Sequence, residues 1–377
     1  MSQSNNRFLE IDLIKAMAII LVIFGHTFSY VQQSTGTILP TTQGTMHIIN
    51  LEGLSLNQIL TKWMTYSGLL TQQVVPVFIV LMGHNFGMSY TRKKYVSLRQ
   101  IYSVNEFVRR FKRLLGPFAI AFISSIIIGI IVLLLTGNWV LYFGPYLLTG
   151  FLPINGPGNY FLSIIFEFLI IFPLMYIAYH QHPKLLIGSS LLCALIFELL
   201  RPSSGIYSIS IIRFLPLIAL GLWISTDHNL FAKRNLWLLP LGIFSGFYII
   251  LVNQFEYQFT FLGINFFQMT KSQNLFACFY TVLLVLVGIQ VLQKSDRWPC
   301  IGIVALIGKA SYHIFLVQII YFGVNKYFYT HYHSIRDIFT IDNVEIILIN
   351  LIICIIVGII FYKLQEWLMV GNNKDRI

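Results

Sequence analysis

Apolar stretches of about twenty residues recur along the whole chain, and they restrict its fold more than any other feature. Hydrophobic residues make up 56% of the 377 and charged residues only 10%, against about 25% charged residues in ordinary soluble domains. A stretch of this length can cross a bilayer as an α-helix. A membrane β-barrel would instead show short segments of alternating polarity. The sequence therefore predicts an all-α integral membrane protein, a polytopic bundle of transmembrane helices.

Ten stretches of this kind can be placed along the chain. We expect them to form one transmembrane domain over residues 1–377, because no fixed-period repeat, long linker or low-complexity segment divides the sequence. The expected spans are 9–31, 69–91, 114–136, 158–179, 185–200, 206–225, 236–253, 274–293, 302–325 and 343–369.

The basic residues predict how these spans are oriented. The loop at 92–115, between the second and third spans, contains eight Lys and Arg residues, and short basic loops stay in the cytoplasm. An even number of spans then places both termini in the cytoplasm. On this topology, cytoplasmic segments hold sixteen basic residues and outer loops hold five. This asymmetry explains the net charge of +11, so we expect no nucleic-acid partner.

The first span carries three ionisable residues, Asp12, Lys15 and His26. Such groups are costly inside a membrane, and they usually face a protein interior or a wet cavity and mark function. Helical geometry places Lys15 and His26 on one face, about 16 Å apart along the axis, with Asp12 one turn before Lys15. A neutral imidazole is the usual general base near pH 7, which makes His26 the leading catalytic candidate. The alternative is a histidine that only hydrogen-bonds between helices.

Two further groups are candidates for function. Arg109, Arg110 and Arg113 cluster just before the third span, and guanidinium groups bind phosphate in a bidentate manner. The cluster would serve a phosphorylated ligand or anionic lipid headgroups, or it would only fix the topology. Glu167 lies in the middle of a span, where a carboxylate needs a partner. It could accept a proton, orient a base, or form a structural ion pair with Arg213.

The outer loops and the cysteines are less informative. The loop at 32–68 is polar, whereas the uncharged loop at 137–157 is expected to be re-entrant or interfacial, with Trp139, Tyr142 and Tyr146 as anchors. The four cysteines are scattered and have neither the spacing of a zinc site nor that of a disulfide framework. We therefore predict no metal site.

Five stretches, taken in order, resemble the acyltransferase 3 family of multi-span membrane proteins. They are IDLIKAMAIILVIFGH from residue 11, VPVFIVLMGHNFG from 75, RRFKRLLGP from 109, NYFLSIIFEFLIIFPL from 159 and IGKASYHIFLVQ from 307. The resemblance implies functional roles for Lys15, His26 and Asp12, and it places Arg110 and Arg113 on the basic R-x-x-R segment of the family. The chain departs from the family where Lys15 replaces the commoner arginine, Met82 a serine, and Gln318 a histidine found in many members.

The resemblance also implies an activity. Such a protein would move an acyl group, most simply acetyl, from cytoplasmic acyl-CoA to a hydroxyl of an extracytoplasmic glycan, polysaccharide or lipid-linked sugar. It would be a multi-pass protein of the cell membrane, surrounded by lipid, with acyl-CoA as a substrate and no permanently bound cofactor. Direct transfer and an acyl-histidine intermediate both remain open, as does homo-oligomer formation. We expect the membrane core alone, without the SGNH esterase-like domain of longer members.

Two other functions are consistent with the same residues. A transporter or flippase of a lipid-linked glycan would also need a polar stripe and a basic cytoplasmic loop. It would move its substrate without acyl chemistry, and transporters often contain paired halves with broken helices, for which the sequence gives no convincing internal symmetry. A purely structural partner in a polysaccharide synthase complex would tolerate replacement of Lys15 and His26.

Overall fold

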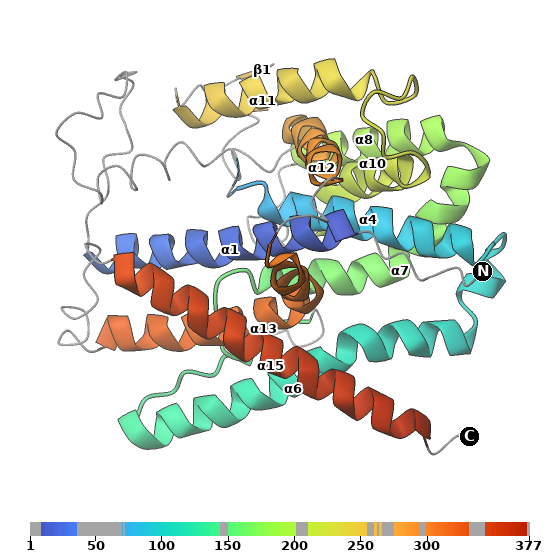
Figure 1. The fold of residues 1–377 in the computed structure, drawn as a ribbon. Helices are drawn as coiled ribbons and strands as arrows, with labels where there is room; N and C mark the ends of the chain where they lie inside the picture. The colour runs from blue at the N-terminus through green and yellow to red at the C-terminus, as the bar shows by residue number, and fades with distance from the viewer. Residues whose placement is uncertain are drawn as a thin grey trace. The chain divides into compact units, whose positions relative to one another are not determined.

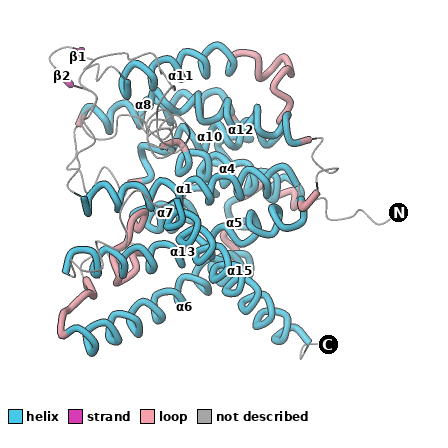
Figure 2. Tube along the Cα trace, turned by 60° about the vertical axis from the view of Figure 1, so that its left-hand side comes forward, coloured by secondary structure: helices cyan, strands magenta, loops and turns pink. Residues whose placement is uncertain are grey.

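The structure is a computed structural model of the 377-residue chain. It describes residues 9–35, 70, 72–143, 150–200, 210–254, 260–261, 264–265, 275–293, 299–331 and 344–374. These residues are almost all helical (Figure 2), and the strands among them are the two-residue β1 (Thr260–Phe261) and β2 (Ile264–Asn265), which pair antiparallel. The predicted all-α class is confirmed. The predicted outer loop at 32–68 falls almost entirely outside the described residues.

The chain divides into two compact units, each described here by itself. The first comprises residues 1–37, 108–159 and 292–377, and the second comprises residues 38–107 and 160–291. The long helices of the first unit are α1 (Leu9–Thr35), α6 (Val104–Thr136, from residue 108 onward), α13 (Ile301–His331) and α15 (Val344–Lys374). Figure 1 shows α1 in blue beside α13 in orange, with α15 in red crossing them.

Helices α1 and α13 run parallel and touch closely at a glycine. A Cβ atom at Gly308 would overlap the backbone carbonyl of Asp12, so only glycine fits at that point. Further along both helices, the ring of His26 lies 6.2 Å from the ring of Phe322. The second contact lies nearer the C-terminal end of both helices than the first, so α1 and α13 run in the same direction.

Helix α15 runs in the opposite direction to α13. Its early residue Asn350 contacts Tyr321, whereas its late residue Gln365 contacts His313. These directions are the ones that the predicted topology assigns to the first, ninth and tenth spans. The number of spans and the side on which the termini lie remain predictions.

The second unit contains the remaining elements. They are α4 (Val74–Arg92), α5 (Leu98–Ile101), α7 (Tyr160–Gln181), α8 (Pro183–Leu199), η2 (Ile211–Phe214), α10 (Leu215–Thr226), α11 (Leu238–Gln254), η3 (Leu275–Ala277) and α12 (Cys278–Leu292). Figure 2 shows α4 and α10 side by side. A Cβ at Gly83 would lie 2.7 Å from the carbonyl oxygen of Ile218, and one at Gly221 would lie 2.5 Å from that of Val80. Small residues of this kind let helix backbones approach closely in membranes.

The lengths of the helices confirm a membrane protein. Each predicted span overlaps a described helix, or a 3-10 turn and the α-helix that follows it. By length and composition, six helices of the described part can cross a membrane: Val74–Arg92, Val104–Thr136, Tyr160–Gln181, Leu275–Leu292, Ile301–Asn325 and Ile347–Leu368. Helix α1 is not among these six, and its first turns carry Glu10, Asp12 and Lys15.

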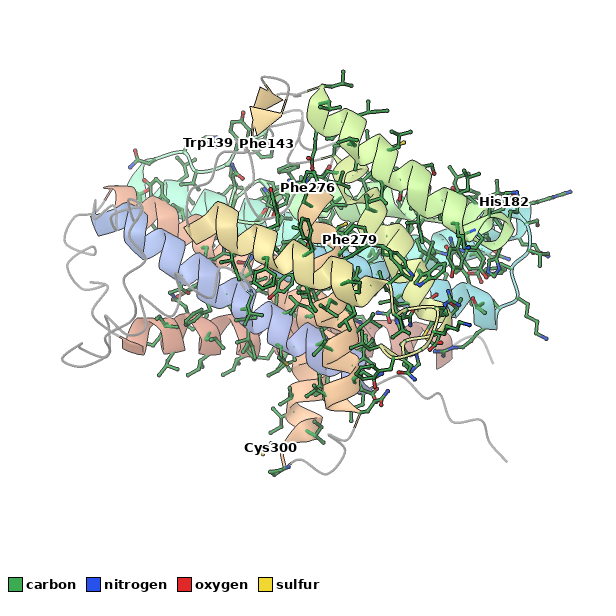
Figure 3. All side chains as sticks on the ribbon, turned by 90° about the horizontal axis from the view of Figure 1, so that it is seen from above. Trp139, Phe143, His182, Phe276, Phe279 and Cys300 are labelled. Atoms are coloured by element: carbon green, nitrogen blue, oxygen red, sulfur yellow. The ribbon has the colours of Figure 1, made fainter. Side chains whose placement is uncertain are left out.

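The chain after α6 begins with exposed aromatic side chains. Trp139 and Phe143 are 61% and 51% exposed, and their rings lie 6.3 Å apart (Figure 3). Trp is one of the amphipathic residues that favour the membrane interface, and the interfacial position of this loop stays a prediction. Tyr142 is also exposed, whereas Tyr146 lies outside the described residues.

Candidate functional site

The ionisable stripe of α1 faces α13. Asp12 is buried, and its Oδ1 lies 3.9 Å from Nζ of Lys15, whose side chain is 21% exposed. Lys15 therefore has its charge next to a buried carboxylate, while part of its length reaches the surface. The helix continues unbroken for three turns to His26, as the spacing predicts.

The residue after His26, Thr27, begins a hydrogen-bond chain that joins three helices. Thr27 donates from Oγ1 to the Ile23 carbonyl at 2.9 Å and accepts from Nδ2 of Asn350 at 3.3 Å. The Tyr321 hydroxyl in turn donates to Oδ1 of Asn350 at 2.6 Å. Thr27 and Asn350 are buried. The chain ties α1, α13 and α15 together beside the imidazole, and it fixes the height at which α1 presents His26.

The basic segment of α6 is held against α13 by one tyrosine. The Tyr312 hydroxyl donates to the Leu114 carbonyl at 3.1 Å. Arg113, which precedes Leu114, is exposed, as is Arg109, whereas Arg110 is partly buried. Pro117 lies inside this helix and has no N–H to offer to the preceding turn. The three arginines lie in the first turns of α6. The hydrogen bond from Tyr312 to Leu114 places them close to α13.

Helix α13 brings two predicted groups to the same level of the first unit. Gly308 contacts Asp12 of α1, and Tyr312, one turn later, contacts Leu114 of α6. At about 1.5 Å rise per residue, these two contacts are about 6 Å apart along α13. His26 meets α13 at Phe322, about 21 Å beyond Gly308 by the same rise. The arginine cluster and Lys15 thus stand near one end of the unit, and His26 stands towards the other.

Glu167 belongs to the second unit. Its Oε2 accepts a hydrogen bond from the backbone N–H of Ile211 at 2.8 Å. This bond provides an acceptor for an N–H group in the first turn of η2, which has no partner within the helix. Two residues later, Arg213 is buried, with its guanidinium 4.2 Å from the ring centre of Phe214. The carboxylate is therefore already engaged with the backbone of the segment that carries Arg213.

Sequence reasoning missed several polar residues of the first unit. Asn350 and Gln365 are buried on α15, where Gln365 hydrogen-bonds His313. Gln318 is also buried on α13, and its Nε2 donates to the Pro157 carbonyl at 3.2 Å. A signal existed for Asn350, because it interrupts the apolar run ILINLIICII. In a membrane span, one amide in such a run indicates a partner on another helix.

The polar stripe on α1, the arginines of α6 and the order of the helices agree with one family of enzymes. The sequence profile of the acyltransferase 3 family, described as an acyltransferase domain, matches residues 8–363. The chain belongs to this family. It is therefore a membrane acyltransferase. No curated protein and no solved structure matched the chain.

Proposed function

We propose that this acyltransferase moves an acyl group, most simply acetyl, from cytoplasmic acyl-CoA to a hydroxyl of an extracytoplasmic glycan, polysaccharide or lipid-linked sugar. The observation that carries the proposal is the arrangement of groups along α13. A basic cluster and the Asp12–Lys15 pair lie at one level, and His26 lies about 21 Å away. Such spacing suits a donor with an anionic end and a long flexible arm. On this proposal the protein resides in the cell membrane.

The donor would be held by its phosphates. Arg109, Arg110 and Arg113 supply guanidinium groups for bidentate contacts, and Lys15 adds a further positive charge at the same level. The thioester would then extend along the unit towards His26. Removing two such charge-assisted contacts costs about 3–6 kcal/mol. Arg110→Ala together with Arg113→Ala should therefore raise the KM for acetyl-CoA at least a hundredfold, and exposed Lys184→Ala should leave it unchanged.

In the proposed direct transfer, the His26 imidazole removes the proton of the acceptor hydroxyl. The oxygen attacks the thioester carbonyl carbon, the carbon–sulfur bond breaks, and the leaving thiolate takes the proton from the imidazolium. In the alternative route, the imidazole attacks the thioester carbon first, the carbon–sulfur bond breaks and the thiolate leaves. The hydroxyl oxygen then takes the acyl group from the imidazole, and the thiolate takes the hydroxyl proton. Asp12 and Lys15 set the local charge at the level where the phosphates of the donor bind. The catalytic role predicted for Glu167 from the sequence stays a prediction.

Acyl transfer in inside-out membrane vesicles tests the proposal. Radiolabelled acetyl-CoA is added on the cytoplasmic side, and label is measured in the glycan and lipid-glycan fractions. Vesicles with the wild-type protein should incorporate label, vesicles without it should not, and unlabelled acetyl-CoA should compete. Movement of glycan without incorporation of label from acetyl-CoA, succinyl-CoA or a longer acyl-CoA would contradict the proposal and favour a flippase.

A further inference from the structure

Gln318 has a buried oxygen that the acyltransferase reaction, as described above, does not use. The residue is fully buried on α13, with 0% of its surface exposed. Its Nε2 donates to the Pro157 carbonyl, but its Oε1 has no hydrogen-bond donor among the described residues. An amide oxygen buried without a partner is unfavourable. Such atoms in native proteins call for an explanation, and a bound ligand group is one.

The orientation of this amide follows from its neighbour. Which end of a glutamine amide is oxygen is assigned from the hydrogen bonds around it. The atom next to Nε2 is the carbonyl oxygen of Pro157, which can only accept a hydrogen bond. The NH2 end must therefore face Pro157, which leaves Oε1 of Gln318 as the end without a donor.

The segment that holds the amide is firmly attached to α13. A Cβ at Gly156 would overlap the Ile319 carbonyl, and Gly158 has a φ of +82°, so glycine is needed at both positions. Asn159 clamps the start of the segment, because its side chain accepts from the Leu152 N–H at 2.9 Å and donates to the Leu152 carbonyl at 3.0 Å. The placement of Gln318 is thus determined by a well-ordered loop.

Gln318 lies on the same face of α13 as the residue that contacts the proposed catalytic histidine. It precedes Phe322 by four residues, so both side chains lie on one face of α13. The Phe322 ring lies 6.2 Å from the ring of His26. Pro157 and Gly158, which contact the amide, are only partly buried. They therefore form the side from which a ligand would approach Oε1.

We propose that Oε1 of Gln318 accepts a hydrogen bond from a hydroxyl group of the acceptor and so holds that acceptor beside His26. The inference rests on the proposed function and names one contact for its acceptor. An amide oxygen is a neutral acceptor, so it can accept a hydrogen bond from a sugar hydroxyl without burying a charge. The segment at 152–159 belongs mostly to the predicted external loop, the side from which the acceptor would come. The amide N–H groups of the acyl-CoA arm are the other source of a neutral donor.

Two variants separate binding from structure. Gln318→Met keeps the length of the side chain and removes both polar atoms, whereas Gln318→His restores one donor and one acceptor. The matched control is Gln365→Met, which alters another buried glutamine whose oxygen is already paired with His313. Each purified protein is reconstituted into liposomes. Initial rates are then measured while either the extracted lipid-glycan fraction or acetyl-CoA is titrated.

Gln318→Met should raise the apparent KM for the lipid-glycan fraction about tenfold, as expected for losing a hydrogen bond in a dry site. Its KM for acetyl-CoA should be unchanged, and Gln318→His should recover most of the loss. Gln365→Met should leave both KM values unchanged. An unchanged KM for the lipid-glycan fraction, or a rise confined to acetyl-CoA, would overturn the inference.

The outcome for the wild-type protein keeps the two proposals apart. If the wild type transfers no label, the proposed function fails, whereas normal transfer with an unaffected Gln318→Met removes only the inference about this contact. Should Gln318→Met not fold, Gln318→Asn replaces it, because the shorter amide cannot reach Pro157 and the ligand together. Equal acceptor KM values for Gln318→Asn and Gln318→His would then overturn the inference.

Discussion

Two pairs of parallel helices, α1–α13 in the first unit and α4–α10 in the second, pack in the same way but differ in chemistry. Both depend on a glycine that meets a backbone carbonyl of the other helix, at Gly308 and at Gly221. The α4–α10 contact is otherwise lined by apolar groups, the Ser225 hydroxyl and the backbone of the buried His84. The α1–α13 contact includes Asp12 and His26. The second pair thus packs closely without a carboxylate or a lysine at the contact, and we propose that the Asp12–Lys15 pair on α1 serves the reaction.

The largest effect is expected when a charged residue of the α1–α13 pair is replaced, and it is a loss of activity. Lys15→Met removes the positive charge beside Asp12 and should lower kcat/KM by roughly 10- to 100-fold, as expected for a charged contact of 1.5–3 kcal/mol. Lys15→Arg keeps the charge and should stay within about threefold of wild type. Ser225→Ala, in the α4–α10 pair, should leave kcat/KM unchanged. Initial rates of acetyl transfer measure all three, and a fully active Lys15→Met would contradict the role given to the stripe.

The next effect concerns stability, where the two pairs should behave alike. Gly308→Ala and Gly221→Ala each force a methyl group into a backbone carbonyl, and overpacking of this kind costs about 1–3 kcal/mol. Both variants should therefore lower the midpoint of thermal unfolding in detergent. Gly302→Ala is the control, because no described atom lies within 4 Å of the added methyl group. A lower midpoint for only one of the two would show that the contacts are not equivalent.

The smallest effect is expected for the hydrogen-bond chain beside His26. Asn350→Leu removes the bridge between Tyr321 and Thr27 and should cost about 1 kcal/mol, the usual value for hydrogen bonds between membrane helices. Because α1 would no longer be fixed at this height, kcat should fall a few-fold more than stability alone explains. Asn350→Asp should not restore kcat, because its carboxylate can accept from Tyr321 but cannot donate to Thr27. Equal kcat values for wild type and Asn350→Leu would mean that the chain supports only the fold.

The sequence predicted those features that depend on one helix at a time. The stripe of Asp12, Lys15 and His26 follows from helical spacing, and the clustered arginines of α6 follow from their positions in the chain. The Thr27–Asn350 hydrogen bond joins residues 323 positions apart, and no local pattern indicates which residues will meet. The contact between Gln318 and Pro157 has the same origin. For Glu167, the sequence suggested Arg213 as a partner, and the structure shows the N–H of Ile211, two residues earlier.

The most direct test of the account is acetyl transfer by His26→Ala, compared with wild type and with exposed His182→Ala (Figure 3). Each protein is reconstituted at equal amounts after its thermal unfolding has been shown to match. General-base catalysis contributes about 10²- to 10⁴-fold, so His26→Ala should lose at least a hundredfold in kcat, and His182→Ala should retain full activity. Transfer by His26→Ala at the wild-type rate would remove the imidazole from the chemistry and contradict the central claim.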